Sequence, residues 1–454
     1  MFRGSLKDVQ DMVGGKGLAV QFENIVATGV TIDSRTVCVG NLYIPIIGAR
    51  VDGHSFVQNV VTVDGCVATL WQQDVPGMPT DIPVIVVEDT KKALQELAMA
   101  YKETLKMKIV GITGSNGKTS TKDILASILA TRYQVHKTLG NFNSEFGMPL
   151  TLLMASNNTE IAVLEMGMRG HGQIKLLSDM AKPDVSMITC IGEAHIEELG
   201  SRENISIAKF EITSGLSEAG LFVYHGDEPL LDLRIAEVQP NFKMIPFGEA
   251  ATNDYYPTSI EVVDNGMTFK INQSDLEFRL SVLGKHNVMN AIAAIAVARH
   301  FDVSFEDIQR GLANIEMSKM RMEVTQAKNG MMIIDDTYNS SPTSVRATLD
   351  LLYTLDSYTQ KIVILGDMLE LGDHEITYHQ TIGAEIDKQQ IDAVLTYGSL
   401  AKHIAEQSKV PLTKHFDDKP ALAAYLESIS DDKTVCLVKG SRGMALEEVI
   451  GLLK

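Results

Sequence analysis

The feature that most constrains this chain is a glycine-rich turn between an apolar run and a segment of helical periodicity. Residues 109–112 are Ile-Val-Gly-Ile, residues 113–119 read Thr-Gly-Ser-Asn-Gly-Lys-Thr, and apolar residues then recur at helical spacing over residues 124–129. A strand that enters such a turn and continues as a helix directs backbone N–H groups and the helix N-terminus towards a phosphate. The sequence therefore predicts a phosphate-binding loop.

The side chains of this turn suit a nucleoside triphosphate with Mg²⁺. Lys118 supplies a positive charge to the phosphates, and the Thr119 hydroxyl supplies a metal ligand. In a strict phosphate loop the first glycine stands where this chain has Ile112, and Gly111 comes one place too early. A glycine-rich turn without a ligand is the alternative. The predicted nucleotide-binding residues of the turn are Gly114, Ser115, Asn116, Gly117, Lys118, Thr119 and Ser120.

The rest of the chain divides into three blocks. A length of 454 residues suggests about three domains, and 45% hydrophobic residues suit a chain with sizeable cores. Residues 1–105 mix short β-rich runs with helical stretches and predict a small α/β domain. Apolar runs alternate with helical periodicity in residues 106–317, which predicts a doubly wound, phosphate-loop ATPase domain. Residues 318–454 repeat the alternation and predict a Rossmann-like terminal domain, so the expected fold class is three-domain α/β.

Charge and cysteine content exclude several classes of partner. The net charge of −18 repels polyphosphate backbones, so we expect no nucleic-acid partner. The apolar stretch 291–298 is too short to cross a bilayer and the N-terminus lacks a signal-peptide core, so we expect a cytoplasmic protein without stable membrane insertion. The four cysteines form no C-x-x-C pair and are expected to be reduced core residues, with neither a zinc cluster nor a disulfide framework.

Two polar residues follow further apolar runs of the central block. Glu165 ends the run 161–164, and His195 follows the run 185–191. Because parallel strands present their carboxyl ends at one edge of a sheet, both side chains are expected beside the phosphate loop, where Glu165 can bind Mg²⁺. The alternatives are that Glu165 is a cap or salt-bridge partner and that His195 is an ordinary loop residue.

These motifs together resemble the Mur ligases, ATP-dependent amide-forming enzymes of peptidoglycan precursor synthesis. The family loop reads Thr-Gly-x-Asn-Gly-Lys-Thr, which accounts for the displaced glycine. Further family-like segments are Glu165-Met166-Gly167, Gly192-Glu193-Ala194-His195, Gly284-Lys285-His286-Asn287 with Asn290, and Met320-Arg321-Met322-Glu323. The family more often has glycine where Met320 stands.

Other segments resemble particular members of the family. Asp33-Ser34-Arg35 and Asp52-Gly53-His54 are similar to the uridine-binding domain shared by the ligases of the third and fourth amino-acid additions. Residues 335–342 and 366–372 resemble the fourth-step ligase, and the Asp-Asn-Pro motif of the third-step ligase is absent. The resemblance implies the substrates UDP-N-acetylmuramoyl-tripeptide and D-alanyl-D-alanine, and we expect a monomer.

The resemblance also implies a mechanism and roles for named residues. ATP phosphorylates the terminal carboxylate of the tripeptide, and the amine attacks the acyl phosphate. Lys118 neutralises phosphate charge, Thr119 and Glu165 hold Mg²⁺, and His195 holds a second Mg²⁺. The adenine lies near Asn287 and Asn290, and the ribose near Arg321 and Asp336. The implied substrate-binding residues are Ser34, Arg35, Asn143, Asn339 and Arg442.

Arg442 follows the last apolar run and is suited to a dipeptide carboxylate through a bidentate contact, although a surface loop is the alternative. Lys209 aligns with a lysine that several family members carry as a carbamate. The alternative for Lys209 is a lysine on a helix face with its ammonium in water.

Three other functions remain open from the sequence. The first two are a third-step ligase that adds lysine or diaminopimelate and a relative of the folate-polyglutamating ligases, both of which share the phosphate loop but use another amine. The third is an ATP-gated binding module without amide formation.

Overall fold

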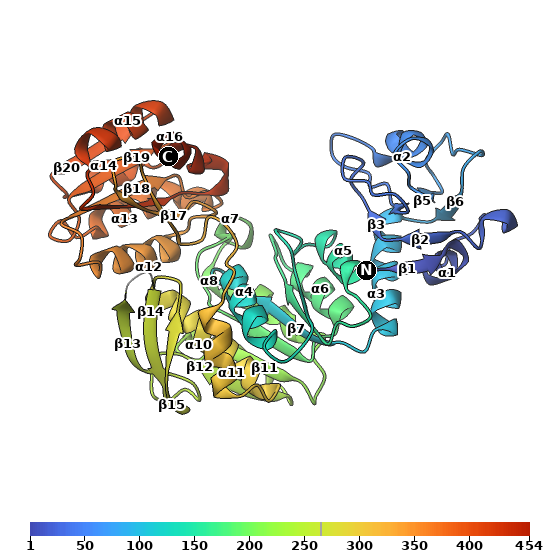
Figure 1. Ribbon diagram of the computed structural model, residues 1–454, viewed down its shortest axis with the longest axis horizontal. Coiled ribbons are helices and arrows are strands. Elements are labelled where there is room, and N and C mark those ends of the chain that lie inside the picture. Colours follow the sequence, from blue (N-terminus) through green and yellow to red (C-terminus); the bar gives the residue numbers. More distant parts are fainter. Residues whose placement is uncertain (264–265) are drawn as a thin grey trace.

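The computed structural model describes residues 1–263 and 266–454, which form five β-sheets. Figure 1 shows the N-terminal unit and the C-terminal unit standing apart on either side of the central unit. The predicted α/β class is confirmed, and the predicted boundaries at 105–106 and 317–318 fall between elements rather than inside them. In the described part of the chain, no helix has the length and apolar character needed to cross a membrane.

The N-terminal unit contains a short parallel sheet and a two-stranded antiparallel one. The parallel sheet has the order β3-β4-β5-β6, and β1 pairs with β2. Residues 41–48 are rich in β-forming side chains but form only the two-residue strand β4. The chain turns back after Pro45, and Ile47 bridges to Asp52. The strands are β1 Arg3–Ser5, β2 Val26–Thr28, β3 Val30–Thr31, β4 Leu42–Tyr43, β5 Ala68–Gln72 and β6 Val84–Val87, and the helices are α1 Leu6–Met12, α2 Val57–Thr62 and α3 Thr90–Thr104.

The central unit is built on a six-stranded parallel sheet, order β12-β11-β10-β7-β9-β8. Its middle strands are buried on both faces, which explains their almost continuous apolar sequences. The strands are β7 Lys108–Thr113, β8 Val135–Lys137, β9 Ile161–Glu165, β10 Val185–Ile188, β11 Leu221–His225 and β12 Lys243–Phe247. The helices are α4 Lys118–Leu129, α5 Gly147–Met154, α6 Gln173–Ala181, α7 Ile196–Leu199, α8 Arg202–Phe210, α9 Pro229–Val238, α10 Lys285–His300 and α11 Phe305–Ala313.

A separate antiparallel sheet of β13 Pro257–Val263, β14 Gly266–Ile271 and β15 Ser274–Leu280 follows this parallel sheet. The predicted doubly wound pattern of residues 106–317 did not include this antiparallel sheet. Met267, Phe269 and Ile271 alternate with more exposed residues, and this period of two buries one face of a strand. The tight connection between β14 and β15 leaves no room for the crossover helix that a parallel pair needs.

The C-terminal unit has a six-stranded sheet of order β16-β17-β21-β18-β19-β20, with only its edge strand β16 antiparallel among the described strands. The carboxyl ends of β17, β18 and β21 therefore meet at one edge. The strands are β16 Glu323–Gln326, β17 Met332–Asp336, β18 Gln360–Gly366, β19 Ala393–Tyr397, β20 Leu412–Phe416 and β21 Thr434–Lys439. The helices are α12 Pro342–Tyr353, α13 Glu375–Glu385, α14 Lys402–Gln407, α15 Lys419–Ile429 and α16 Glu447–Leu453.

The linker between α11 and β16 is fastened to the helix that follows the phosphate loop. The buried carboxylate of Asp123, on α4, accepts hydrogen bonds from the backbone N–H and the hydroxyl of Ser318 at 3.0 and 2.7 Å. Two residues later, Met320 has a φ of 60°, the left-handed conformation that glycine adopts without steric cost. Methionine therefore stands here in a backbone conformation that favours glycine.

Candidate active site

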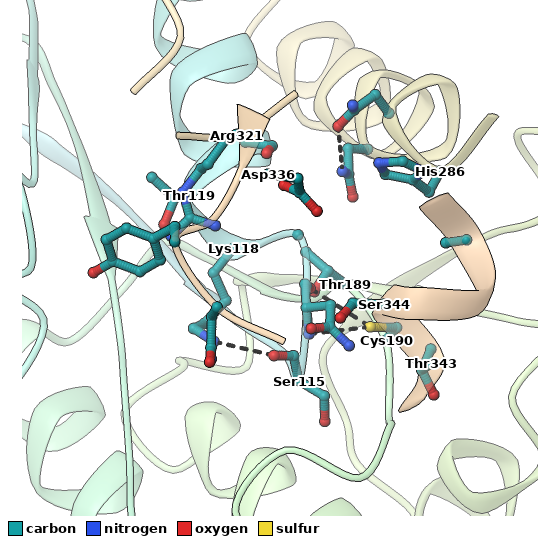
Figure 2. A pocket seen from close by; sticks show the side chains of 18 of the residues that line it. Ser115, Lys118, Thr119, Thr189, Cys190, His286, Arg321, Asp336, Thr343 and Ser344 are labelled. Atoms are coloured by element: carbon teal, nitrogen blue, oxygen red, sulfur yellow. Dashed lines mark hydrogen bonds between the residues drawn. The ribbon is translucent and has the colours of Figure 1, made fainter. Parts of the chain in front are cut away.

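The candidate site is a cavity of about 1530 Å³ between the central and C-terminal units. Figure 2 shows side chains of both units around it, including Lys118 and Thr119 from the central unit and Arg321 and Asp336 from the other. The carboxyl ends of β7, β9 and β10 reach it from one side, and those of β17, β18 and β21 from the other. Two sheets thus present their carboxyl edges to a single space, the position where open α/β sheets bind ligands.

The phosphate loop has its glycines where a side chain would collide. Gly114 has a φ of 152°, and a Cβ there would lie 1.8 Å from Thr189 Oγ1. Gly117 has a φ of 81°, and a Cβ there would lie 2.5 Å from Asn290 Oδ1. Ile112, where a strict phosphate loop has its first glycine, is fully buried within β7. The turn is therefore shifted along the chain, and it still continues directly into helix α4.

Lys118 lies folded over the loop. Its Nζ donates a hydrogen bond to the Gly114 carbonyl oxygen at 2.8 Å. Burial lowers the pKa of Lys118, since the charged ammonium is withdrawn from water. A polyanion brought into the loop would favour the charged form of this lysine, which is the electrostatic condition for a phosphate site.

Glu165 is buried at the end of β9 and holds two polar side chains. Thr119 Oγ1 donates to Glu165 Oε2 at 2.8 Å, and Asn143 Nδ2 donates to Glu165 Oε1 at 2.8 Å. A carboxylate and a hydroxyl next to a phosphate loop are the oxygen donors that Mg²⁺ prefers, so these residues fit the predicted metal. The interpretation of Glu165 as a helix cap or salt-bridge partner does not match these contacts.

His195 lines the same cavity and meets the C-terminal unit. Its Nδ1 lies 2.6 Å from Glu370 Oε2, and this contact lowers the pKa of the Glu370 carboxyl. Both residues have left-handed backbones, with φ of 66° and 64°. Two strained loops from different units thus place an imidazole against a carboxylate. His195 is therefore more than an ordinary loop histidine, although its predicted role towards a second Mg²⁺ stays a prediction.

The four residues predicted for adenine and ribose all line the cavity. Asn290 Nδ2 donates to Asn287 Oδ1 at 3.2 Å. Because a Cβ on Gly117 would collide with Asn290, this pair packs against the phosphate loop. The Arg321 guanidinium lies over the Tyr338 ring, 4.1 Å from its centre. The Asp336 carboxylate lies 2.5 Å from Lys439 Nζ. Tyr338 and Lys439 were not among the predicted site residues.

The predicted substrate residues fall into two groups. Asn143, Asn339 and Arg442 line the cavity, with the Arg442 guanidinium 2.5 Å from Glu447 Oε1. Ser34 and Arg35 belong to the N-terminal unit and are not among the residues that line the cavity. Arg35 is exposed and lies 2.7 Å from Asp33 Oδ2, within a turn closed by a hydrogen bond from Thr36 N to Asp33 O.

Lys209 is buried near the end of α8 and has only 1% of its surface exposed. Burial lowers its pKa well below the usual value for lysine, and the charge of Lys118 acts in the same direction. The alternative of an ammonium in water was therefore wrong. Ile212, which follows this helix, lies in the 3₁₀ turn Glu211–Thr213.

Glu193 had no predicted role of its own, and the prediction for two of the cysteines was wrong. Glu193 Oε2 accepts hydrogen bonds from the backbone N–H and the hydroxyl of Thr343, at 3.1 and 2.6 Å, in the first turn of α12. The only signal for Glu193 was its place in a family-like segment. Cys66 and Cys436 are buried as expected, whereas Cys38 is exposed and Cys190 lines the cavity.

Three family models match the chain in succession. The Mur ligase family, catalytic domain model matches residues 26–102, the Mur ligase middle domain model residues 112–298, and the Mur ligase, glutamate ligase domain model residues 320–442. Among curated proteins, the UDP-N-acetylmuramoyl-tripeptide–D-alanyl-D-alanine ligase of Bacillus subtilis (strain 168) is 44% identical over 99% of this chain and 98% of its own length.

Solved structures agree over the whole chain. Crystal structure I of MurF from Acinetobacter baumannii superimposes with a TM-score of 0.90 at 29% identity, covering 100% of this chain and 99% of that one. MurF ligase from Thermotoga maritima, crystallised in complex with ADP, has a TM-score of 0.84 at 29% identity, covering 94% and 97%. The similarity therefore includes all three units and their arrangement.

Proposed function

The chain belongs to the Mur ligase family, and from that premise we propose that it joins D-alanyl-D-alanine to UDP-N-acetylmuramoyl-tripeptide in an ATP-dependent reaction that forms ADP and phosphate. The observation that carries this proposal is the cavity between two sheet edges, where a phosphate loop faces Asn339 and Arg442 of the C-terminal unit. The substrate assignment is supported by the full-length Bacillus subtilis relative of that name.

The first step is phosphorylation of the tripeptide carboxylate. A carboxylate is a poor electrophile, and phosphorylation gives it a leaving group. Transfer of a phosphoryl group between anions needs alignment and charge neutralisation more than covalent help from the protein. Lys118 supplies a cation to the transferred group from its position over the loop. The helix N-terminus of α4 adds its backbone N–H groups.

Thr119 and Glu165 are the residues proposed to hold Mg²⁺, with His195 proposed for a second ion. When bound, Mg²⁺ neutralises charge on the phosphates and on the incoming carboxylate. Asn143 fixes one oxygen of Glu165, so the other oxygen stays directed at the Thr119 hydroxyl. The hydrogen bond from Asn143 thus keeps the Glu165 carboxylate oriented towards the phosphate loop.

The second step is attack of the dipeptide amine on the acyl phosphate, with phosphate as the leaving group. The proposed nucleotide contacts are Asn287 and Asn290 for the adenine and Arg321 and Asp336 for the ribose. Arg442 is proposed to receive the dipeptide carboxylate, and Asn339 lies on the same side of the cavity.

Lys209 is proposed to be carbamylated. Its neutral amine nitrogen adds to CO₂ and releases one proton, which converts an uncharged side chain into an anion. Burial that lowers the pKa of this lysine supplies the neutral amine. The resulting carbamate would place a negative group near Lys118, the residue whose charge now disfavours the ammonium.

The three predicted domains divide the substrates between them. Residues 1–105 are proposed to bind the uridine through Ser34 and Arg35, residues 106–317 to bind ATP, and residues 318–454 to bind the dipeptide. Because the N-terminal unit stands apart in Figure 1, the tripeptide has to reach from that unit into the cavity.

Amine-dependent phosphate release tests the function. With ATP, Mg²⁺ and UDP-N-acetylmuramoyl-tripeptide present, we expect phosphate release and an amide product that require D-alanyl-D-alanine. Lysine, diaminopimelate and glutamate should not replace it. Turnover with one of the first two amines and a UDP-dipeptide would instead indicate a third-step ligase, and turnover with glutamate and a folate would indicate the folate relative. ATP binding without any amide product would indicate the ATP-gated binding module.

A further inference from the structure

The amine substrate poses a recognition problem that the residues assigned so far do not solve. A dipeptide at neutral pH is a zwitterion, with an ammonium at one end and a carboxylate at the other. Arg442 suits the carboxylate, but the reacting nitrogen also needs a partner of opposite charge beside the acyl phosphate. The candidate is an acidic side chain of the C-terminal unit that reaches the central unit.

Four of the six carboxylates that line the cavity have cationic or structural partners, and of the other two, Asp350 and Glu370, it is Glu370 that contacts the central unit through His195. Glu165 holds Thr119 and Asn143, and Asp336 pairs with Lys439. Glu249 pairs with Lys285 at 2.6 Å, and Glu145 with Lys91 at 3.4 Å. Glu370 instead lies against the His195 imidazole, and its side chain is 47% exposed. An ammonium can therefore reach this carboxylate without breaking a lysine or arginine ion pair.

The loop that carries Glu370 is fastened by the residues that precede it. Asp367 Oδ1 accepts hydrogen bonds from the backbone N–H groups of Leu400 and Ala401, at 3.0 and 2.7 Å. The Met368 N–H donates to His379 Nε2 at 2.9 Å. These contacts hold Glu370 in its left-handed conformation, which is strained for a residue other than glycine. A backbone held in this way fixes the direction of the Cα–Cβ bond of Glu370.

The same loop touches the one that carries Arg442. The Leu369 N–H donates to Ser441 Oγ at 2.9 Å, and a Cβ on Gly443 would lie 3.1 Å from Leu369 Cδ1. A carboxylate and a guanidinium therefore stand on adjacent loops at the edge of one sheet, and both line the cavity. Opposite charges on neighbouring loops are the arrangement that a zwitterion requires.

We propose that Glu370 binds the ammonium group of the dipeptide beside the acyl phosphate, while Arg442 binds the carboxylate. The nitrogen attacks the acyl phosphate once the ammonium has lost one proton to water. This inference rests on the proposed function and names the receptor for the amine. Glu370 exchanges its contact with His195 for the incoming ammonium. His195 is then free to face the phosphorylated carboxylate.

The test separates amine binding from phosphorylation. Glu370→Gln keeps the shape of the side chain and removes its charge. We expect the KM for D-alanyl-D-alanine to rise about tenfold to a hundredfold, as for a lost hydrogen bond to a charged group. The KM values for ATP and UDP-tripeptide should stay within about twofold of the original. Glu448→Gln is the matched control, since Glu448 is exposed in the same unit and pairs with Lys419.

Hydroxylamine provides the second readout because it is largely uncharged at neutral pH and displaces phosphate from an acyl phosphate to form a hydroxamate. Glu370→Gln should still form hydroxamate, which also shows that the variant is folded. An unchanged KM for the dipeptide, or a loss of hydroxamate equal to the loss of ligation, would overturn the proposal. In the second case Glu370 serves phosphorylation. If the unaltered protein forms neither hydroxamate nor amide, the proposed function itself fails.

Discussion

At the residue scale, two lysines with different surroundings are proposed to take part in the chemistry. Lys118 has the Gly114 carbonyl as a hydrogen-bond partner and lines the cavity. Lys209 lies deeper, and both burial and the charge of Lys118 lower its pKa. The first lysine is suited to act as a cation, and the second to act after it has lost its proton.

Replacing Lys118 by alanine should abolish ligation and leave UDP-tripeptide binding almost intact. The uridine is assigned to the N-terminal unit, and the phosphates of ATP to the loop. Calorimetric titration with UDP-tripeptide should give a Kd within about twofold of the original, while phosphate release is lost. Lys175→Ala, on the exposed face of α6, is the control. A Kd that rises as far as turnover falls would disprove this division between the units.

Replacing Lys209 by alanine should remove most of the activity. Activity of the unaltered protein should fall in CO₂-free buffer and return when bicarbonate is added. Since the carbamate forms on the neutral amine, this recovery should strengthen as the pH rises through the lowered pKa. Short carboxylates such as acetate or formate should partly rescue the variant. A fully active Lys209→Ala protein in CO₂-free buffer would refute carbamylation, and loss without rescue would leave a packing role.

Local sequence was enough for some of these residues and not for others. Lys118 and Glu165 follow apolar strands directly, so the parallel sheet alone brings them to one edge. Glu193 and Thr343 lie 150 residues apart, and His195 meets Glu370 across a domain interface. No periodicity or spacing reports how two units dock, and such pairs therefore become visible only in the structure.

At the element scale, helix α4 links the nucleotide loop to the linker. Although burial opposes ionisation, Lys122 and Lys137 hold the pKa of Asp123 below its usual range. Lys122 is itself buried, and its Nζ lies 3.4 Å from Asp123 Oδ1. The helix that begins at the phosphate loop thus carries a charged cluster that fixes the start of the linker through Ser318.

Replacing Asp123 by alanine should cost roughly 3–5 kcal/mol in the central unit, because a buried lysine loses its counter-charge. Thermal unfolding should show a clear fall in Tm. Asp179→Ala removes an exposed carboxylate paired with Lys175 and should cost about 1 kcal/mol or less. The lowered pKa means that the contribution of Asp123 is complete above the unfolded pKa of about 4 and is lost at lower pH. Equal melting of the two variants would contradict the prediction.

Strand and helix positions were predictable where one period dominated. The run 185–191 contains the strand β10, and the helical spacing over residues 124–129 lies within α4. The prediction did not include β13–β15, where parallel-sheet expectations hid a period of two. At Met320 the sequence departs from the family, and the backbone there has a left-handed φ of 60°.

At the scale of the whole molecule, the three units form a bent chain with the N-terminal and C-terminal units at opposite ends. The central and C-terminal units already touch through Glu193, Asn116 and His195. The N-terminal unit is the one that stands away from the cavity.

Binding of ATP together with UDP-tripeptide should compact the molecule. The tripeptide has to place its carboxylate at the phosphate loop while its uridine stays on the N-terminal unit, so the two ends of that substrate draw the units together. Small-angle scattering should show a smaller radius of gyration with both ligands than with either alone. An unchanged radius in their joint presence would mean that the arrangement in Figure 1 is already the working one.

The separation of the N-terminal unit has a further consequence for the economy of the reaction. An acyl phosphate in a cavity open on one side can be captured either by the dipeptide or by water. Each capture by water discards one ATP and returns the tripeptide unchanged. If the N-terminal unit closes on the cavity as predicted, the ratio of phosphate released to amide formed measures how well this unit then excludes water. A variant whose N-terminal unit binds the UDP group more weakly should show a higher ratio before the rate of amide formation falls.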